Sequence, residues 1–247
     1  MRLTERVHLV GSGSSGFDLT DTWDAHVYLV DGGAEAALVD VGCGRGVDAI
    51  LRNVEAAGVT LDRLRHLLLT HAHADHCGGT AATRNRLPHV QVTASPQVAR
   101  WVRSADEQAM SVETGKRAEF YPADFAFVAA QVDREVADGQ RLSIGEVRVQ
   151  VVATPGHSDG HLSFLARTHG TTVLFGGDLV FFGGRISLLN NWDCRLREYA
   201  DSMAKLGRAG IDVLLPGHHS LSLRDGQRHV DTANRLFEHG FVPPSLV

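Results

Sequence analysis

Cysteine is scarce in this 247-residue chain, and the three that occur lie far apart. Cys43, Cys77 and Cys194 are odd in number and form no CxxC pair, which argues against a disulfide framework or an all-cysteine zinc site. Disulfides persist mainly in oxidising compartments. We therefore expect a cytoplasmic protein that does not depend on disulfides for its stability.

Long apolar runs and basic clusters are also absent from the sequence. No stretch approaches the roughly 18–20 apolar residues that span a bilayer, and the N-terminal apolar segment is too short for a signal peptide. The 24 basic residues are outnumbered by 29 acidic ones, without a long Lys/Arg run. The sequence therefore predicts neither a membrane partner nor a nucleic-acid partner.

Short apolar segments alternate with helical patterns along the chain. Strands are predicted at 7–10, 25–30, 36–41, 67–69, 147–153, 162–166, 171–175 and 211–215. Helices are predicted at 46–57, 79–86, 196–207 and 225–239. This order predicts an α/β (α+β) chain in which two sheets pack face to face with helices outside. We expect one domain over residues 1–247, with a helical insert at about 95–135, where the strand pattern stops.

A glycine-rich segment after the first predicted strand matches a dinucleotide-binding pattern. Residues 11–16 read GSGSSG, which fits GxGxxG. That motif binds a pyrophosphate where a helix begins, but the following FDLTDTWDAHVYLV predicts a loop and then a strand. We interpret the segment as a loop between strands, which can still border a site.

Histidine is abundant, with 14 in the chain, and four potential metal ligands fall in one heptapeptide. THAHADH at 70–76 follows an apolar strand directly. His71 and His73 point the same way in an extended segment, and Asp75 and His76 turn toward a second point as a helix begins. Imidazoles with a carboxylate suit zinc, and also iron or manganese. The segment therefore predicts a metal site.

Three later strand ends each place another potential ligand after a tight turn. VVATPGH ends at His157, VLFGGD ends at Asp178, and VLLPGH ends at His218. Glycine or proline before each ligand suits a tight turn and a close backbone approach. Because strand ends on one rim of a sandwich are rigid, these side chains can converge with the histidine cluster on one centre.

In this order and with these gaps, THAHADH, TPGH, FGGD and LPGH resemble the metallo-β-lactamase superfamily. The resemblance runs from about Val27 to His218 and includes LVDVG at 38–42. It implies an αββα sandwich, the metallo-β-lactamase fold, with two divalent metal ions at one edge; zinc is expected, and iron or manganese are alternatives. It implies that Asp40 steadies the histidine loop. The implied ligands are His71, His73 and His157 for the first metal, Asp75, His76 and His218 for the second, and Asp178 for both.

Two metal ions about 3.5–4 Å apart can share a water and lower its pKa toward neutrality. The resulting bridging hydroxide would attack a carbonyl carbon, with Asp75 as the catalytic residue that orients it and accepts its proton. No GxSxG elbow or CxxC pair supplies a rival nucleophile. The sequence therefore predicts a glyoxalase-II-like binuclear hydrolase of a small-molecule ester, thioester or lactone.

A few residues bear on the subfamily. Superfamily β-lactamases carry Cys or Ser where this chain has Asp178, which argues against β-lactam hydrolysis. Homoserine lactonases carry Tyr where this chain has Phe181. This difference disfavours an N-acyl homoserine lactonase-like function but leaves it as an alternative. GGDLVFFGGR and GHSDGHLSF are similar to glyoxalase II, but the 29 residues after His218 are fewer than its glutathione-binding region needs.

A persulfide dioxygenase-like oxidoreductase with one iron is the alternative of another class, and the complete second ligand set argues against it.

Other residues near these motifs have several interpretations. We interpret His161 and His219 as supporting polar residues and Cys77 as a small buried side chain. Arg185 either holds a substrate carboxylate or is structural. Six large side chains of the insert either form a lid or pack into the core: Trp101, Met110, Phe120, Tyr121, Phe125 and Phe127. The substrate, the native metal and a possible homodimer stay open.

Overall fold

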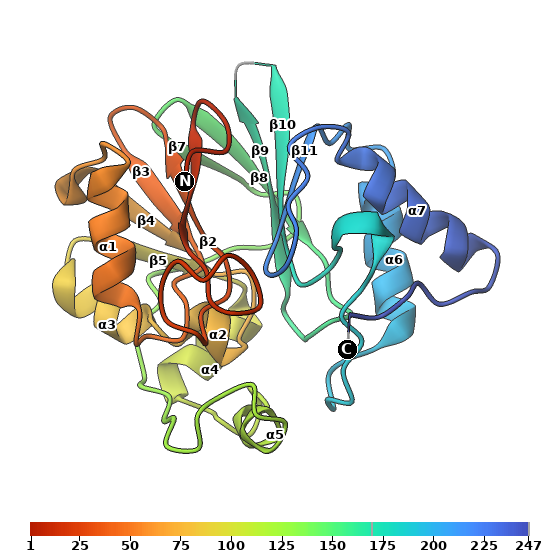
Figure 1. Ribbon diagram of the computed structural model, residues 1–247, viewed down its shortest axis with the longest axis horizontal. Helices are drawn as coiled ribbons and strands as arrows, with labels where there is room; N and C mark the ends of the chain where they lie inside the picture. The colour runs from red at the N-terminus through yellow and green to blue at the C-terminus, as the bar shows by residue number, and fades with distance from the viewer. Residues whose placement is uncertain (169, 247) are drawn as a thin grey trace.

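The computed structural model describes residues 1–168 and 170–246, and its two β-sheets lie face to face (Figure 1). Within the described residues the first sheet has six strands in the order β1-β2-β3-β4-β5-β6. They are β1 (Val7–Gly11), β2 (Val27–Asp31), β3 (Ala36–Val39), β4 (Leu64–Leu68), β5 (Gln91–Ala94) and β6 (Arg134–Glu135). The second sheet has the order β11-β10-β9-β8-β7. Its strands are β7 (Arg141–Ile144), β8 (Val147–Ala153), β9 (Leu162–Thr168), β10 (Thr171–Gly177) and β11 (Val213–Pro216).

Helices flank the two sheets on their outer faces (Figure 1). On the side of the first sheet lie α1 (Val47–Ala56), α2 (Ala74–Cys77), α3 (Thr80–Arg86), α4 (Pro96–Ser104) and α5 (Val112–Arg117). On the side of the second sheet lie α6 (Leu196–Leu206) and α7 (Gln227–Glu238). Short 3₁₀ turns are η1 (Leu61–Arg63) and η2 (Phe182–Gly184). Within the described part of the chain, no helix combines the length and apolar character needed to cross a membrane.

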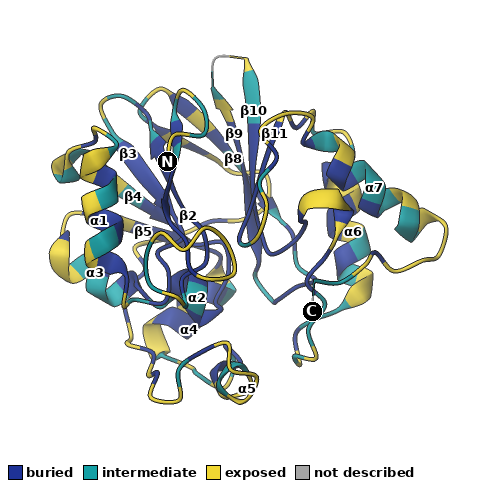
Figure 2. Cartoon of the chain, viewed as in Figure 1, coloured by how far each residue is buried: buried dark blue, intermediate teal, exposed yellow. Residues whose placement is uncertain are grey.

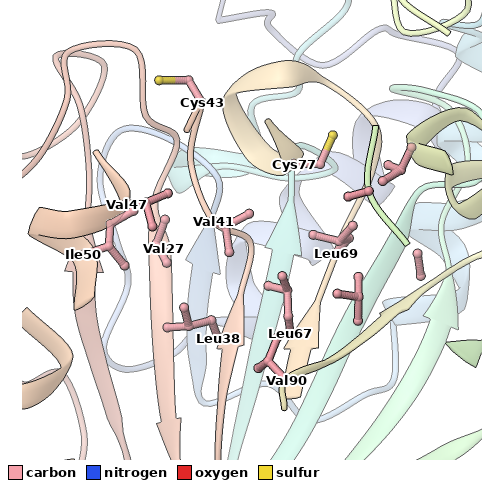
Figure 3. Packing of buried hydrophobic residues seen from close by; sticks show 14 of the residues in the cluster. Val27, Leu38, Val41, Cys43, Val47, Ile50, Leu67, Leu69, Cys77 and Val90 are labelled. Atoms are coloured by element: carbon pink, nitrogen blue, oxygen red, sulfur yellow. The ribbon is translucent and has the colours of Figure 1, made fainter. Parts of the chain in front are cut away.

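Three apolar layers hold these four layers of structure together. Between α1 and the first sheet, Val47 and Ile50 pack with Val27 and Leu38 (Figure 3). Between the sheets lie alternate residues of β8, because successive side chains of a strand point to opposite faces. A third layer lies under α6 and α7. Most strands are accordingly buried along much of their length (Figure 2). The order of the layers, helices outside two facing sheets, confirms the predicted αββα sandwich (Figure 1).

The structure changes two details of the sequence prediction and confirms the loop at residues 11–16. Strands β5 and β7, each four residues long, were not predicted because such short segments carry little periodicity. The predicted insert at 95–135 does contain α4 and α5, but it ends in β6, which pairs with β5 through Thr93 and Arg134. Residues 11–16 lead from β1 into a loop where no helix begins, so the dinucleotide pattern is coincidental. The single domain over residues 1–247 stays a prediction.

Candidate metal centre and cleft

The seven predicted ligands follow strand ends of both sheets and meet at one edge of the sandwich. Four of them come from the loop and short helix α2 after β4 of the first sheet. The other three follow β8, β10 and β11 of the second sheet. Five of the side chains are buried, and Asp75 and His218 are partly exposed. The tertiary structure therefore brings together all the residues that the motifs singled out: His71, His73, Asp75, His76, His157, Asp178 and His218.

Three imidazoles form the first group of potential ligands. The Nε2 atoms of His71 and His157 lie 3.1 and 3.0 Å from Nδ1 of His73. The opposite ring nitrogen of His157 lies 2.9 Å from the backbone carbonyl of Ser187, so it donates there and Nε2 carries a lone pair. Burial lowers the pKa of His71 well below its usual value and that of His157 to about 4. Neutral rings that aim nitrogen lone pairs at one point are suited to hold a cation.

A carboxylate and two imidazoles form the second group. Oδ2 of Asp75 lies 3.0 Å from Nε2 of His218 and 3.4 Å from Nε2 of His76. Burial favours the neutral acid, but the positive charge on His76 and His218 outweighs it, so the pKa of Asp75 falls below its usual range. Asp75 is therefore ionised at neutral pH. This group mixes nitrogen and oxygen donors, which zinc, iron and manganese all accept.

Asp178 lies between the two groups. Its Oδ1 is 3.4 Å from Nε2 of His76, and its Oδ2 is 3.6 Å from Nε2 of both His157 and His218. Burial raises its pKa, but His218 and His76 outweigh this effect and hold the pKa well below its usual range. Oδ1 is buried and has no hydrogen-bond partner among the described residues. An ionised, buried oxygen that lacks a hydrogen bond is costly even beside a charged imidazole, so this residue set fits bound cations.

Asp40 holds the histidine loop in place. Its backbone has a positive φ of 59°, and its carboxylate accepts hydrogen bonds of 2.8 Å from the amide and the hydroxyl of Thr70. The same carboxylate lies 2.8 Å from Nδ1 of His76, so that ring turns Nε2 into the centre. Because the Thr70 hydroxyl donates to Asp40, Nδ1 of His71 donates to that hydroxyl at 3.0 Å. Asp40 thus orients ligands of both groups, as the resemblance implied.

His161 supports the opposite side of the centre. Its Nε2 accepts the backbone N–H of Asp178 at 3.1 Å, so Nδ1 is the protonated nitrogen and donates to the Thr154 hydroxyl at 2.9 Å. His161 is therefore a fully buried supporting residue whose lone pair is already used.

A cleft of about 560 Å³ opens over the centre. The loop that carries the GxGxxG pattern contributes Ser14 and Ser15 to its wall, so this loop does border the site. The insert contributes Phe120 and Tyr121 together with part of α5 (Figure 1). The other large side chains of the insert are buried in the layer on the first sheet instead: Trp101, Met110, Phe125 and Phe127.

Tyr121 makes a contact that no motif indicated. Its hydroxyl donates to Oδ1 of Asp75 at 2.9 Å and accepts the backbone N–H of Ala74 at 3.2 Å. The insert is thereby tied to the residue predicted to be catalytic. Its only sequence signal was membership in an aromatic-containing insert, and the contact spans 46 positions of the chain.

The chain was compared with protein families and curated proteins. A model described as the metallo-beta-lactamase superfamily matches residues 20–218. A hydroxyacylglutathione hydrolase of Stenotrophomonas maltophilia is 29% identical over 219 residues, which are 87% of this chain and 69% of that protein. An acyl-coenzyme A thioesterase of Gallus gallus is 27% identical over 216 residues, with 80% and 73% covered. An atrochrysone carboxyl ACP thioesterase of Aspergillus fumigatus is 28% identical over 212 residues, 86% of this chain, which spans about half (55%) of that relative.

Solved structures show the same fold. A metallo-β-lactamase of Cronobacter sakazakii has a TM-score of 0.73 at 21% identity, with 97% of this chain and 96% of that chain covered. A subclass B3 metallo-β-lactamase of Bradyrhizobium japonicum has a TM-score of 0.72 at 23% identity, with 97% and 91% covered. Since the family model also spans most of the sequence, this chain belongs to the metallo-β-lactamase superfamily.

Proposed function

We propose that this chain is a binuclear metal-dependent hydrolase that cleaves a small-molecule ester, thioester or lactone. The observation that carries the proposal is the convergence of seven ligand side chains in two groups, with Asp178 within 3.4–3.6 Å of ring nitrogens from both. We assign His71, His73 and His157 to one metal and Asp75, His76 and His218 to the other. Asp178 would serve both.

Two divalent ions in such a centre lower the pKa of a water and polarise the substrate carbonyl. Zinc is the metal that we propose, because imidazole nitrogens predominate among the donors. Iron and manganese accept the same donors and are the alternatives to be tested.

Asp75 is the residue to which we assign proton transfer. Its carboxylate is ionised, lines the cleft and is oriented by the Tyr121 hydroxyl. It can therefore orient a nucleophilic water toward the carbonyl and accept its proton.

Within this proposal a thioester is the favoured substrate. Two of the relatives are named as thioesterases, and a third is named as a hydroxyacylglutathione hydrolase. Phe181 lines the cleft without a hydroxyl to assist a lactone carbonyl, which disfavours the lactonase alternative. The second group of ligands similarly disfavours a dioxygenase with one iron.

Metal analysis of the purified protein, followed by a panel of esters, thioesters, lactones and β-lactams, tests the proposal. We expect two metal ions per chain and thioester hydrolysis. The variant Asp75→Asn keeps the size of the side chain and should lower kcat by roughly 10²-fold, as for loss of a general base. One iron per chain without hydrolysis of any substrate would contradict the proposal, as would normal turnover of Asp75→Asn with both metals bound.

A further inference from the structure

The walls of the cleft carry no lysine or arginine among the described residues that line it. Most of the wall is neutral: Ser14, Ser15, Thr22, Trp23, Ser111, Thr114, Ala118, Phe120, Leu188, Leu189, Asn190, Asn191 and Leu246. Proteins that recognise substrate carboxylates or phosphates normally use arginine or lysine for this purpose. This cleft offers hydroxyls, amides and apolar surface instead.

Three cations close in sequence to the lining residues, Lys116, Arg117 and Arg185, do not themselves line the cleft. Arg117 donates from Nε to the backbone carbonyl of Glu113 at 3.2 Å. Lys116 pairs with Glu113 at 2.8 Å, outside the lining. Arg185, the residue considered for binding a substrate carboxylate, is exposed and donates to the backbone carbonyl of Ser245 at 2.8 Å. Its positive charge helps to lower the pKa of His219, after the larger effect of desolvation, but its side chain does not line the cleft.

The wall also carries one carboxylate that the structure does not otherwise use. Asp24 lines the cleft, but its carboxylate accepts the Thr20 hydroxyl at 2.6 Å and the Cys43 amide at 2.8 Å. Glu119 is exposed beside Phe120, and within the described residues its carboxylate has no ion-pair partner. An unpaired negative charge on the wall repels an anionic group that enters the cleft.

We infer that this cleft selects acyl groups without a negative charge, and that Glu119 is a residue that enforces this selection. The inference rests on the proposed hydrolysis, in which the acyl carbon loses its bond to sulfur and gains one to the oxygen of water, giving a carboxylic acid and a thiol. The hydroxyl, amide and apolar walls suit a neutral acyl chain that carries oxygen-containing groups. A terminal carboxylate that lies against this wall, away from the proposed metal centre, would lose water without finding a lysine or arginine among the described lining residues, and a site discriminates against a charge left unpaired in this way.

Three thioesters of one neutral thiol, N-acetylcysteamine, test the inference: hexanoyl, adipoyl, and adipoyl with its terminal carboxylate as the methyl ester. We expect kcat/KM for the adipoyl compound to be at least about tenfold below that of its methyl ester, because desolvating an unpaired charge is costly. Glu119→Gln should narrow this ratio by about three- to tenfold, and Glu119→Lys should narrow it further. The control is Glu55→Gln, which removes the same charge from an exposed position of α1 outside the cleft, without releasing a paired lysine, and should leave the ratio unchanged.

Two results would overturn the inference while the hydrolase proposal stands. One is an adipoyl thioester cleaved as fast as its methyl ester. The other is a selective loss of adipoyl cleavage in Arg185→Ala, which would show that Arg185 binds the carboxylate. Calorimetric binding of the matching non-hydrolysable thioethers separates the two proposals: preference for the neutral thioether supports the inference even if no thioester is cleaved, and preference for the anionic one refutes it.

Discussion

A hydrogen bond to one nitrogen of an imidazole determines what the other nitrogen can do. The Ser187 carbonyl, the Asp40 carboxylate and the Thr70 hydroxyl each hold the proton of a histidine on the side away from the centre. In His71 and His157 the Nε2 lone pair therefore faces inward before any metal binds, which reduces the reorganisation that metal binding requires. Burial lowers the pKa of His76, but Asp75 and Asp178 outweigh it and raise this pKa well above its usual value, so His76 must release the proton on Nε2 when a metal binds.

Removing a ligand of one group should change the metal content differently from removing the carboxylate that we assign to both metals. His71→Ala should remove most of the first metal and retain the second, whereas Asp178→Ala should weaken both, because the Asp178 carboxylate lies within 3.6 Å of ring nitrogens of both groups. Metal content per chain after dialysis checks this. Equal metal content in the wild type and both variants would contradict the ligand assignment.

The Tyr121 hydroxyl should act through Asp75. Tyr121→Phe keeps the ring, which packs 5.6 Å from that of Phe125, but removes the hydrogen bond to Asp75. We expect activity or affinity for the second metal to fall by about 10–100-fold, as for other residues that orient ligands, while the stability of the metal-free protein falls by only about 1 kcal/mol.

The matched control for this variant is Tyr28→Phe. It also removes a buried hydroxyl, but one that donates to the backbone carbonyl of Pro216 at 2.6 Å. It should affect stability, by about 1 kcal/mol, more than metal affinity. Equal loss of metal affinity in both variants would show that the effect of Tyr121 is merely structural.

At the scale of elements, the insert divides its aromatic side chains between two tasks. Part of it, from Ser111 to Tyr121, forms a wall of the cleft. Trp101 on α4 is 5% exposed and packs 6.0 Å from the ring of Trp192, while Phe120 is 50% exposed and lines the cleft. The middle of the insert is therefore cleft wall, and the segments on either side of it, with Trp101 and Phe125, belong to the core.

This division predicts opposite effects for two truncations. Phe120→Ala should flatten the dependence of kcat/KM on acyl-chain length, since each buried methylene contributes about 0.8 kcal/mol, and should leave the melting temperature nearly unchanged. Trp101→Ala should lower the free energy of unfolding by about 3–5 kcal/mol without changing the dependence of kcat/KM on acyl-chain length. A series of acyl thioesters and thermal melts measure both effects. A wild-type profile that does not depend on chain length would remove the insert from substrate recognition.

At the scale of the whole molecule, the proposed metal centre joins the two sheets. His71, His73 and His76 follow a strand of the first sheet, whereas His157 and His218 follow strands of the second. Metal ions held there would connect halves that also meet through apolar packing, an ion pair between Arg6 and Glu146, and hydrogen bonds such as that from Tyr28 to Pro216.

Chelation should therefore destabilise the folded protein. A metal that binds only the folded state adds about 4 kcal/mol at a thousandfold excess over its Kd, so we expect a clear drop in melting temperature on adding a chelator. Asp178→Ala should show a smaller drop, because it binds less metal to begin with. An unchanged melting temperature in a wild type shown to lose both metals would contradict this coupling.

The amino-acid sequence by itself determined the sandwich, most of its strands and the candidate ligands. This was possible because the ligands follow local signals: the histidine cluster comes directly after an apolar strand, and each later ligand comes after an apolar strand and a glycine or proline turn, as in TPGH after β8 and LPGH after β11. Only the tertiary structure decided the pairing of β5 with β6, the hydrogen bond from Tyr121 to Asp75, and the lack of cations on the described cleft wall. These features join residues from separate loops whose side chains follow no period, so no local pattern could place them, and only the packing of the whole chain does.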